Sequence, residues 1–320
     1  MDKLIEDVIP AVDRDLLLSE LTEDKFLRHS GKGGNYLYLI TNKNAPNVMR
    51  EIGRLREITF REAGGGTGKS MDIDAYDTSD VPYMQLLSWD PEANEIIAGY
   101  RLLKCIHANQ DENGQIITAT SHLFHLSDKF NEEYLTATLE LGRSFVQPKY
   151  QSKNPKGIFS LDNLWDGLGA VSRLNPDIKY YLGKVTMYPD YNREGRNLIL
   201  SFVSQFFPDD IGIGTPLHPL ITGAEVEVIE KLKPLWYDKT YKEGHTKLNK
   251  MIRELGENIP PLINSYMNLT DTMKTFGTSV NRNFGDVEET GILVTIEDLH
   301  PTKKLRYFDS YEAHKDFKKA

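Results

Sequence analysis

The sequence predicts an α/β fold in which helices flank a mixed central sheet. Short runs rich in apolar and aromatic residues predict strands at 36–41, 83–89 and 95–106. Apolar residues at helical spacing predict amphipathic helices at 160–171 and 193–207. Strands and helices therefore alternate through much of the chain, and this order is typical of a layered α/β architecture.

The chain is expected to have three parts. Residues 1–35 read as a helical lead-in, and residues 36–225 as the core domain that holds the main sheet. Residues 226–320 read as a helical extension, with a late strand at 291–296 that packs on the core. Asn-Gly at 113–114 predicts a hairpin turn within an irregular excursion of the core.

Composition narrows the class of protein. The chain has 320 residues, of which 39% are hydrophobic and 27% charged, as expected for a globular protein with a sizeable core. The net charge of -9 argues against a nucleic-acid-binding function. Because Cys105 is the single cysteine, an internal disulfide framework is excluded and a reducing compartment is expected.

No segment is expected to cross a membrane or to direct secretion. No run approaches the ~18 consecutive apolar residues of a membrane span. The acidic start of the chain, residues 1–7, lacks the apolar region of a signal peptide. We therefore expect a cytoplasmic protein, with peripheral contact at the cytoplasmic membrane face as a further option.

The strand at 138–148 has features that a plain core strand does not need. Gly142 in a strand interior marks a bulge or a close approach by a ligand. Pro148 ends the pairing since it has no N–H to donate. A strand that stops pairing here exposes backbone N–H and C=O groups to a ligand. The alternative is that Glu140 and Arg143 form a purely structural pair.

A glycine-rich loop precedes a group of acids. Residues 63–70, Ala-Gly-Gly-Gly-Thr-Gly-Lys-Ser, resemble a phosphate-binding loop with Ala in the first Gly position. That loop requires a preceding strand, whereas here a helix precedes it, so a flexible active-site loop is favoured over a nucleotide site. The acids Asp72, Asp74 and Asp77 are interpreted as solvated, as metal ligands or as partners of a substrate ammonium group.

Two other side-chain types were candidates for chemistry. His122 and His125 could both bind a metal, but no third ligand is suggested nearby, so ordinary histidines are favoured. Cys105 lies in an apolar strand and is interpreted as a small buried hydrophobe. No metal site is therefore predicted.

A basic stretch follows the strand at 138–148. No acid lies between Glu140 and Asp162, while Lys149, Lys153 and Lys156 supply positive charge. One interpretation is a solvated lysine loop. The other is a docking surface for an acidic partner or a phosphate.

Six motifs together resemble a known family. Residues 140–146, Glu-Leu-Gly-Arg-Ser-Phe-Val, resemble the E-L-G-R-S-C-V signature of GNAT-fold N-acyltransferases that acylate ornithine or glycine from acyl carrier protein. Members of this branch are often labelled as hemolysins, and they are similar more distantly to acyl-homoserine-lactone synthases. The other matching segments, in order, are 55–62, 71–77, 99–103, 164–168 and 260–266. This sequence departs from the family at Phe145, where a Cys is usual, and in its Gly-rich loop.

The resemblance implies a GNAT-like (acyl-CoA N-acyltransferase) fold and a reaction. A fatty acyl group would arrive as a phosphopantetheine thioester, on acyl carrier protein or CoA, and pass to the amine of glycine or ornithine in aminolipid synthesis. This co-substrate is the only cofactor implied, with no permanently bound group and no metal. The implied partners are acyl carrier protein and a small amino acid, with no nucleic acid.

The resemblance also implies residue roles. Glu140 would be the general base, acting directly or through water. The amino acid would be bound by Asp74, Asp77 and Arg101, with Arg101 or Arg61 at its carboxylate. The pantetheine arm would be bound near Arg143, Phe145, Val146 and Gln147, and carrier protein would dock on Lys149, Lys153 and Lys156. Two alternatives stay open: an acyl-homoserine-lactone-like synthase, and a non-enzymatic membrane-active hemolysin or lipid-binding protein.

Overall fold

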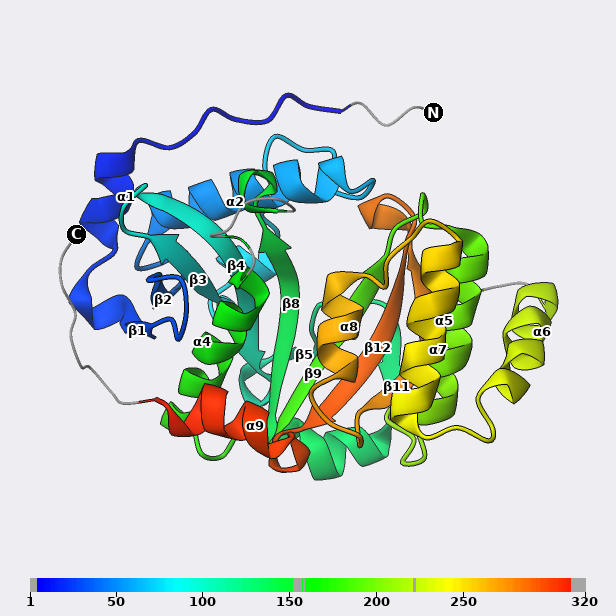
Figure 1. The fold of residues 1–320 in the computed structure, drawn as a ribbon. Coiled ribbons are helices and arrows are strands. Elements are labelled where there is room, and N and C mark those ends of the chain that lie inside the picture. The colour runs from blue at the N-terminus through cyan, green and yellow to red at the C-terminus, as the bar shows by residue number, and fades with distance from the viewer. Residues whose placement is uncertain (1–4, 152–156, 158, 221–222, 312–320) are drawn as a thin grey trace. The chain divides into compact units, whose positions relative to one another are not determined.

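A computed structural model shows two compact units, which we describe separately (Figure 1). The structure describes residues 5–151, 157, 159–220 and 223–311. Unit 1 comprises Met1–Gln110, Leu139–Ile178 and Pro301–Ala320, and unit 2 comprises Asp111–Thr138 and Lys179–His300. Each unit is therefore assembled from segments that are far apart in the sequence, unlike the three consecutive parts that the sequence predicted.

Unit 1 contains an antiparallel series of strands. They are β1 (Phe26–His29), β2 (Tyr36–Ile40), β3 (Met84–Asp90), β4 (Glu95–Lys104) and β8 (Thr138–Val146), in the spatial order β1-β2-β3-β4-β8. The strands predicted at 36–41, 83–89 and 95–106 are confirmed. β1 differs from the sequence prediction, because it lies within the segment that was expected to be a helical lead-in. The helix that the structure describes in this segment is α1 (Arg14–Glu20).

Two long helices cover opposite faces of these strands. They are α2 (Pro46–Glu62) and α4 (Ser160–Leu174). Arg56 of α2 donates to the side chain of Gln85 on β3, whereas Gly167 of α4 lies against the adjacent Leu86. Neighbouring residues of a strand point to opposite faces, so the side chains of β3 separate an α2 face from an α4 face.

The last described segment of unit 1 packs on α4. It comprises α9 (Pro301–Lys304) and a turn at Leu305–Asp309. The carbonyl oxygen of Tyr307 lies so close to Gly169 that a Cβ there would be 2.1 Å from it. Tyr307 Oη also donates to Asp162 at 3.0 Å, and Arg306 pairs with the same carboxylate at 2.8 Å. Glycine at 169 is thus required by close backbone packing.

β8 contains the predicted bulge. Gly142 pairs with Arg101 and Phe145 pairs with Gly99, so β8 has one more residue than β4 between these two pairs. The residue in the left-handed region is Arg143, with φ of 50°, rather than Gly142. The Phe145 ring covers Gly99, where a Cβ would lie 2.6 Å from a ring carbon. The extra residue restores Phe145 to the face that carries Gly142 and Arg101.

Unit 2 has its own strands and helices. Its strands β9 (Tyr180–Met187), β12 (Val287–Thr295) and β11 (Lys274–Asn281) pair antiparallel in that order, and β10 (Gly214–Pro216) pairs with β7 (Phe124–Leu126). Its helices are α5 (Arg193–Phe206), α6 (Gly223–Leu232), α7 (Tyr241–Glu254) and α8 (Pro261–Met267). The helix predicted at 193–207 and the late strand are confirmed, and β11 was missed. No helix in the described ranges is long and apolar enough to span a membrane.

Candidate active site

Charged and polar side chains gather on the α2 face of unit 1. Arg101 on β4 is opposite Gln85 on β3 and Gly142 on β8, so residues at these positions share one face. Glu140 lies two residues before Gly142 and faces the same way. We call the charged residues gathered here the Glu140 cluster: Arg56, Asp72, Asp74, Asp77, Arg101, Glu140 and Arg143. Most of them are almost fully buried, so each charge requires a partner.

Asp77 is the centre of the ion pairs. Its carboxylate lies 3.1 Å from Arg56 Nη1 and 3.4 Å from Arg101 Nη1, and it accepts from Gln85 Nε2 at 3.0 Å. Burial alone would raise the pKa of Asp77, but the two arginine charges outweigh it and lower the pKa to about 2. Burial would likewise lower the pKa of Arg101, yet the carboxylates of Asp77 and Asp74 raise it. Asp77 and Arg101 therefore both stay charged at neutral pH.

Asp74 and Arg143 are the more exposed members of the cluster. Asp74 accepts from Arg101 Nη1 at 2.8 and 2.9 Å, and its side chain is 29% exposed. The Arg143 side chain is 17% exposed, and its Nε lies 2.8 Å from buried Asp72, without the angles of a hydrogen bond. A small substrate can reach these two charges from solvent. Asp77 and Arg101 are enclosed behind them, so their contact with substrate stays a prediction.

Glu140 is held by a residue that the sequence did not single out. Its Oε2 accepts a hydrogen bond from Tyr83 Oη, and both side chains are almost fully buried. The Tyr76 ring packs edge-on against the Tyr83 ring at 5.5 Å between centroids. Burial and then the Glu140 charge raise the pKa of Tyr76, which places that charge nearby. A carboxylate in such an enclosed position can act as a proton acceptor.

The Gly-rich loop binds a carboxylate of its own chain. The N–H groups of Thr67 and Gly68 donate to Glu57 of α2 at 3.1 and 2.8 Å, and the Thr67 hydroxyl donates at 2.7 Å. Burial favours a raised pKa for Glu57, but these bonds together with Arg61 lower it. A carboxylate thus occupies the position that a phosphate takes in a nucleotide loop. The absence of a nucleotide site stays a prediction, and the bonds to Glu57 support it.

Arg61 is engaged at the Gly-rich loop rather than in the Glu140 cluster. Its guanidinium lies 2.8 Å from Glu57 and donates to the carbonyl oxygen of Lys69 at 2.8 Å. Residues five apart on a helix point about 140° away from each other, so Arg56 and Arg61 cannot face the same site. The structure therefore argues against the predicted contact of Arg61 with the substrate carboxylate, and it adds Arg56 to the cluster instead.

The end of β8 is tied to β4. The N–H of Gln147 donates to Ile97 at 2.9 Å, its side chain donates to the carbonyl of Ile96, and its own carbonyl accepts from Tyr150 at 2.9 Å. These bonds engage the backbone groups and the side-chain nitrogen of Gln147, and its contact with pantetheine stays a prediction. The predicted contacts of Phe145 and Val146 stay predictions.

The predicted docking lysines are only partly described. Lys149 is 57% exposed and pairs with Glu95 at 2.6 Å, and the opposite oxygen of Glu95 lies 2.6 Å from Arg14. Lys153 and Lys156 lie outside the described residues. The described part of this surface therefore combines two exposed cations around one acid.

Possible metal ligands do not form a site in the described part of the chain. No group of three or more His, Cys, Asp or Glu side chains there is arranged to hold a metal ion. Asp72, Asp74 and Asp77 each lie against arginine instead. Burial raises the pKa of the Cys105 thiol, in keeping with its interpretation as a core residue.

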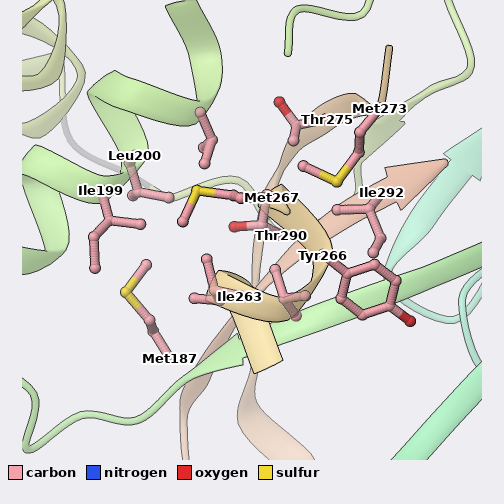
Figure 2. A pocket seen from close by; sticks show the side chains of 12 residues that line it. Met187, Ile199, Leu200, Ile263, Tyr266, Met267, Met273, Thr275, Thr290 and Ile292 are labelled. Atoms are coloured by element: carbon pink, nitrogen blue, oxygen red, sulfur yellow. The ribbon is translucent and has the colours of Figure 1, made fainter. Parts of the chain in front are cut away.

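Unit 2 contains an apolar pocket that sequence analysis did not identify (Figure 2). The lining residues come from β9, α5, α8, β12, the start of β11 and the residue that precedes β11. They are Val185, Met187, Ile199, Leu200, Val203, Ile263, Tyr266, Met267, Met273, Thr275, Thr290 and Ile292. Three are methionines, whose flexible side chains adapt to ligands of different shape. The pocket is small and its lining carries no charged side chain.

Comparison with known proteins gives consistent similarities. The acetyltransferase (GNAT) domain family matches residues 55–158. A glycine N(alpha)-acyltransferase of Bacteroides thetaiotaomicron is 53% identical over 98% of this chain and 93% of its own length. One of Phocaeicola vulgatus is 50% identical over 96% of this chain and 94% of its own length. A solved CoA-dependent acyl-homoserine lactone synthase matches with a TM-score of 0.31 and 17% identity, covering 48% of this chain and 68% of that chain, too distant to bear on activity.

Proposed function

Since this chain belongs to the GNAT-domain family of glycine Nα-acyltransferases and is an N-acyltransferase, we propose that it transfers a fatty acyl group from a thioester to the amine of glycine. The observation that carries the proposal is the similarity to two proteins of that name along nearly the whole chain. Glycine is favoured over ornithine on the same ground. The product would be an acylated amino acid, a precursor of aminolipids.

The residues of unit 1 support a direct-attack mechanism. The ammonium group of the amino acid must lose a proton before it can react, and Glu140, directly or through one water, is the proposed acceptor. The amine nitrogen then bonds to the thioester carbonyl carbon, and the C–S bond breaks to release the pantetheine thiolate, which takes up a proton. Asp74 and Arg143 are exposed enough to hold the ammonium and carboxylate groups of the substrate.

The pocket of unit 2 supports a fatty rather than a short acyl group. Each methylene transferred from water to an apolar lining contributes about 0.8 kcal/mol. A lining of Met, Ile, Leu and Val side chains offers this gain without a charged group that a hydrocarbon would have to desolvate. We assign the distal part of the acyl chain to this pocket, which has room for only about one water molecule as it stands and must widen by movement of its flexible methionine side chains.

Acyl carrier protein is the proposed donor. Carrier proteins are acidic, so exposed cations such as Lys149 would speed their approach, and the effect would weaken with salt. Replacing Lys149, Lys153 and Lys156 by Glu is expected to raise KM for acyl carrier protein much more than KM for glycine. Equal changes in both, or none, would reject the docking role and leave acyl-CoA as the alternative donor.

The proposed function can be tested with purified protein. Acyl carrier protein and CoA thioesters are each incubated with glycine or ornithine, and products are identified by mass spectrometry. Acylglycine formed fastest from acyl carrier protein is the expected result. Formation of a lactone, or lysis of membranes without any acylated product, would favour the two alternatives from the sequence. Lipid extracts of expressing cells give an independent check.

A further inference from the structure

We infer that Tyr83 is a positioning residue for the catalytic carboxylate of Glu140. This inference rests on the proposed function, because it assigns Tyr83 a task in the proton transfer from the acceptor amine. Its observation is the hydrogen bond that Tyr83 Oη donates to Glu140 Oε2 inside unit 1. Tyr83 does not touch substrate in this arrangement. It acts through Glu140.

The Tyr83 ring is fixed from several sides. The Arg101 guanidinium carbon lies 5.0 Å from its centroid, and the Tyr76 ring packs on it edge-on. Its backbone N–H donates to the carbonyl of Tyr76 at 2.9 Å, and its carbonyl accepts from Gln85 Nε2 at 3.2 Å. With the ring and the backbone both held, the hydroxyl has one defined position, and that position is at Glu140.

The acidic segment builds the support for this tyrosine. Asp74 and Asp77 form a capping box that starts the short helix α3 (Ala75–Thr78), which carries Tyr76. Arg101 binds the same two carboxylates and lies over the rings of Tyr76 and Tyr83. The enclosed charges of the Glu140 cluster thus order the two tyrosines, even where they do not contact substrate.

The hydrogen bond fixes the orientation of the Glu140 carboxylate. A misplacement of a reacting group by about 1 Å can cost about 100-fold in rate. A carboxylate without this donor would therefore be less well aimed at the amine. A purely structural role for Tyr83 predicts a loss of stability, with normal turnover in the molecules that fold.

The test is Tyr83→Phe, which removes only the hydroxyl. We expect kcat for glycine acylation to fall about 10- to 100-fold, with KM for both substrates changed less than about twofold. This split between kcat and KM separates a positioning role from a structural one, because a variant that only folds less well keeps its turnover per folded molecule. Tyr307→Phe is the matched control, since Tyr307 is also buried in unit 1 and donates to a carboxylate, Asp162.

Two further variants keep the inference testable if Tyr83→Phe folds poorly. Site-specific 3-fluorotyrosine at 83 keeps both the shape of the side chain and its hydrogen-bond donor, so kcat should stay within about twofold of the wild-type value. In a Glu140→Gln background, Tyr83→Phe should cost little further activity, because both changes disrupt the same hydrogen-bonded pair. Full kcat in folded Tyr83→Phe protein, or a loss with 3-fluorotyrosine as large as that with Phe, would overturn the inference. Absence of acylglycine from the wild-type protein would instead reject the proposed function.

Discussion

The Glu140 cluster and the apolar pocket represent opposite ways of building a binding region. In the cluster, buried charges lie within about 3 Å of opposite charges, as with Arg56 and Asp77 at 3.1 Å. In the pocket of unit 2, the lining is almost wholly aliphatic, thioether or aromatic, with Thr275 and Thr290 as exceptions. Directional ion pairs fix the positions of the groups they join, whereas apolar contacts depend on area and tolerate repacking.

This difference fits the different tasks that we propose for the two regions. Proton transfer requires groups held at hydrogen-bond distance, and the rigid cluster offers that around Glu140. Acceptance of a hydrocarbon chain requires area and adaptability, and methionines such as Met187 and Met267 offer these. Changes in the cluster should therefore affect turnover and stability, and changes in the pocket should affect the choice of acyl chain.

The sharpest test of this division is Glu140→Gln. We expect kcat to fall about 10²–10⁴-fold, the usual size of a general-base effect, with a smaller loss at high pH where more amine is unprotonated. Glu289→Gln is the matched control, since Glu289 is also a buried strand glutamate but lies in unit 2. Full turnover of a folded Glu140→Gln enzyme at neutral pH would remove Glu140 from the mechanism.

The next largest effect is expected on the stability of the fold when Asp77 is replaced. The pKa of Asp77 is lowered from 3.8 to about 2 in the folded protein, so its ionised form stabilises the fold at pH above about 4. This contribution, about 2 kcal/mol, is lost as pH falls through about 2. Asp77→Asn should lower the free energy of unfolding by at least that amount at neutral pH. Urea titrations should show the difference narrowing between about pH 4 and 2, and a constant difference would contradict the ion-pair account.

A smaller and more selective effect is expected in the pocket. Val203→Phe fills part of it, and displacing about two methylenes of a bound chain costs about 1.5 kcal/mol, or about tenfold in kcat/KM for long acyl donors. Short donors should be affected much less. Leu198→Phe is the matched control, a buried position on the same helix that does not line the pocket. Equal losses of kcat/KM for long and short donors in both variants would show that the acyl chain does not bind in the pocket.

The smallest expected effect is that of Lys69→Ala. The loop N–H groups already bind Glu57, so Lys69 has no phosphate to hold, and kcat should stay within about twofold of the wild-type value. Equilibrium dialysis should detect no ATP binding by either protein. Saturable ATP binding that disappears in the variant would contradict this interpretation and would show that the Gly-rich loop of unit 1 binds a nucleotide.

Local patterns in the sequence predicted the local features of the fold. Apolar runs and helical spacing are properties of residues that are close in the sequence. These patterns predicted β2, β3, β4, α4 and α5. β1 was missed because only four residues form it, and β11 because polar residues and Gly277, with φ of 98°, interrupt its alternation. The bulge in β8 was predicted from Gly142, although Arg143 is the residue that adopts the unusual conformation.

The parts of the candidate site that lie within a single short sequence motif were predictable. Glu140 and the acids at 72–77 stand in short characteristic segments, and the structure brings them together. Tyr83 was missed because its bond to Glu140 joins residues 57 positions apart. The pocket was missed for the same reason, since its lining residues are ordinary ones that come, two or three at a time, from five separate parts of the chain. Pairings of this kind depend on topology, which periodicity does not encode.

The packing of Tyr307 on Gly169 has a consequence for the order in which parts of the protein can fold during synthesis. Residues of unit 2 have all been made once the ribosome has added His300, although unit 1 begins first. Unit 1 cannot cover α4 until the segment with Arg306 and Tyr307 emerges, because that segment supplies the partners of Asp162. This part of α4 therefore stays uncovered until after all of unit 2 has been made, and exposed surface at that stage is what chaperones recognise.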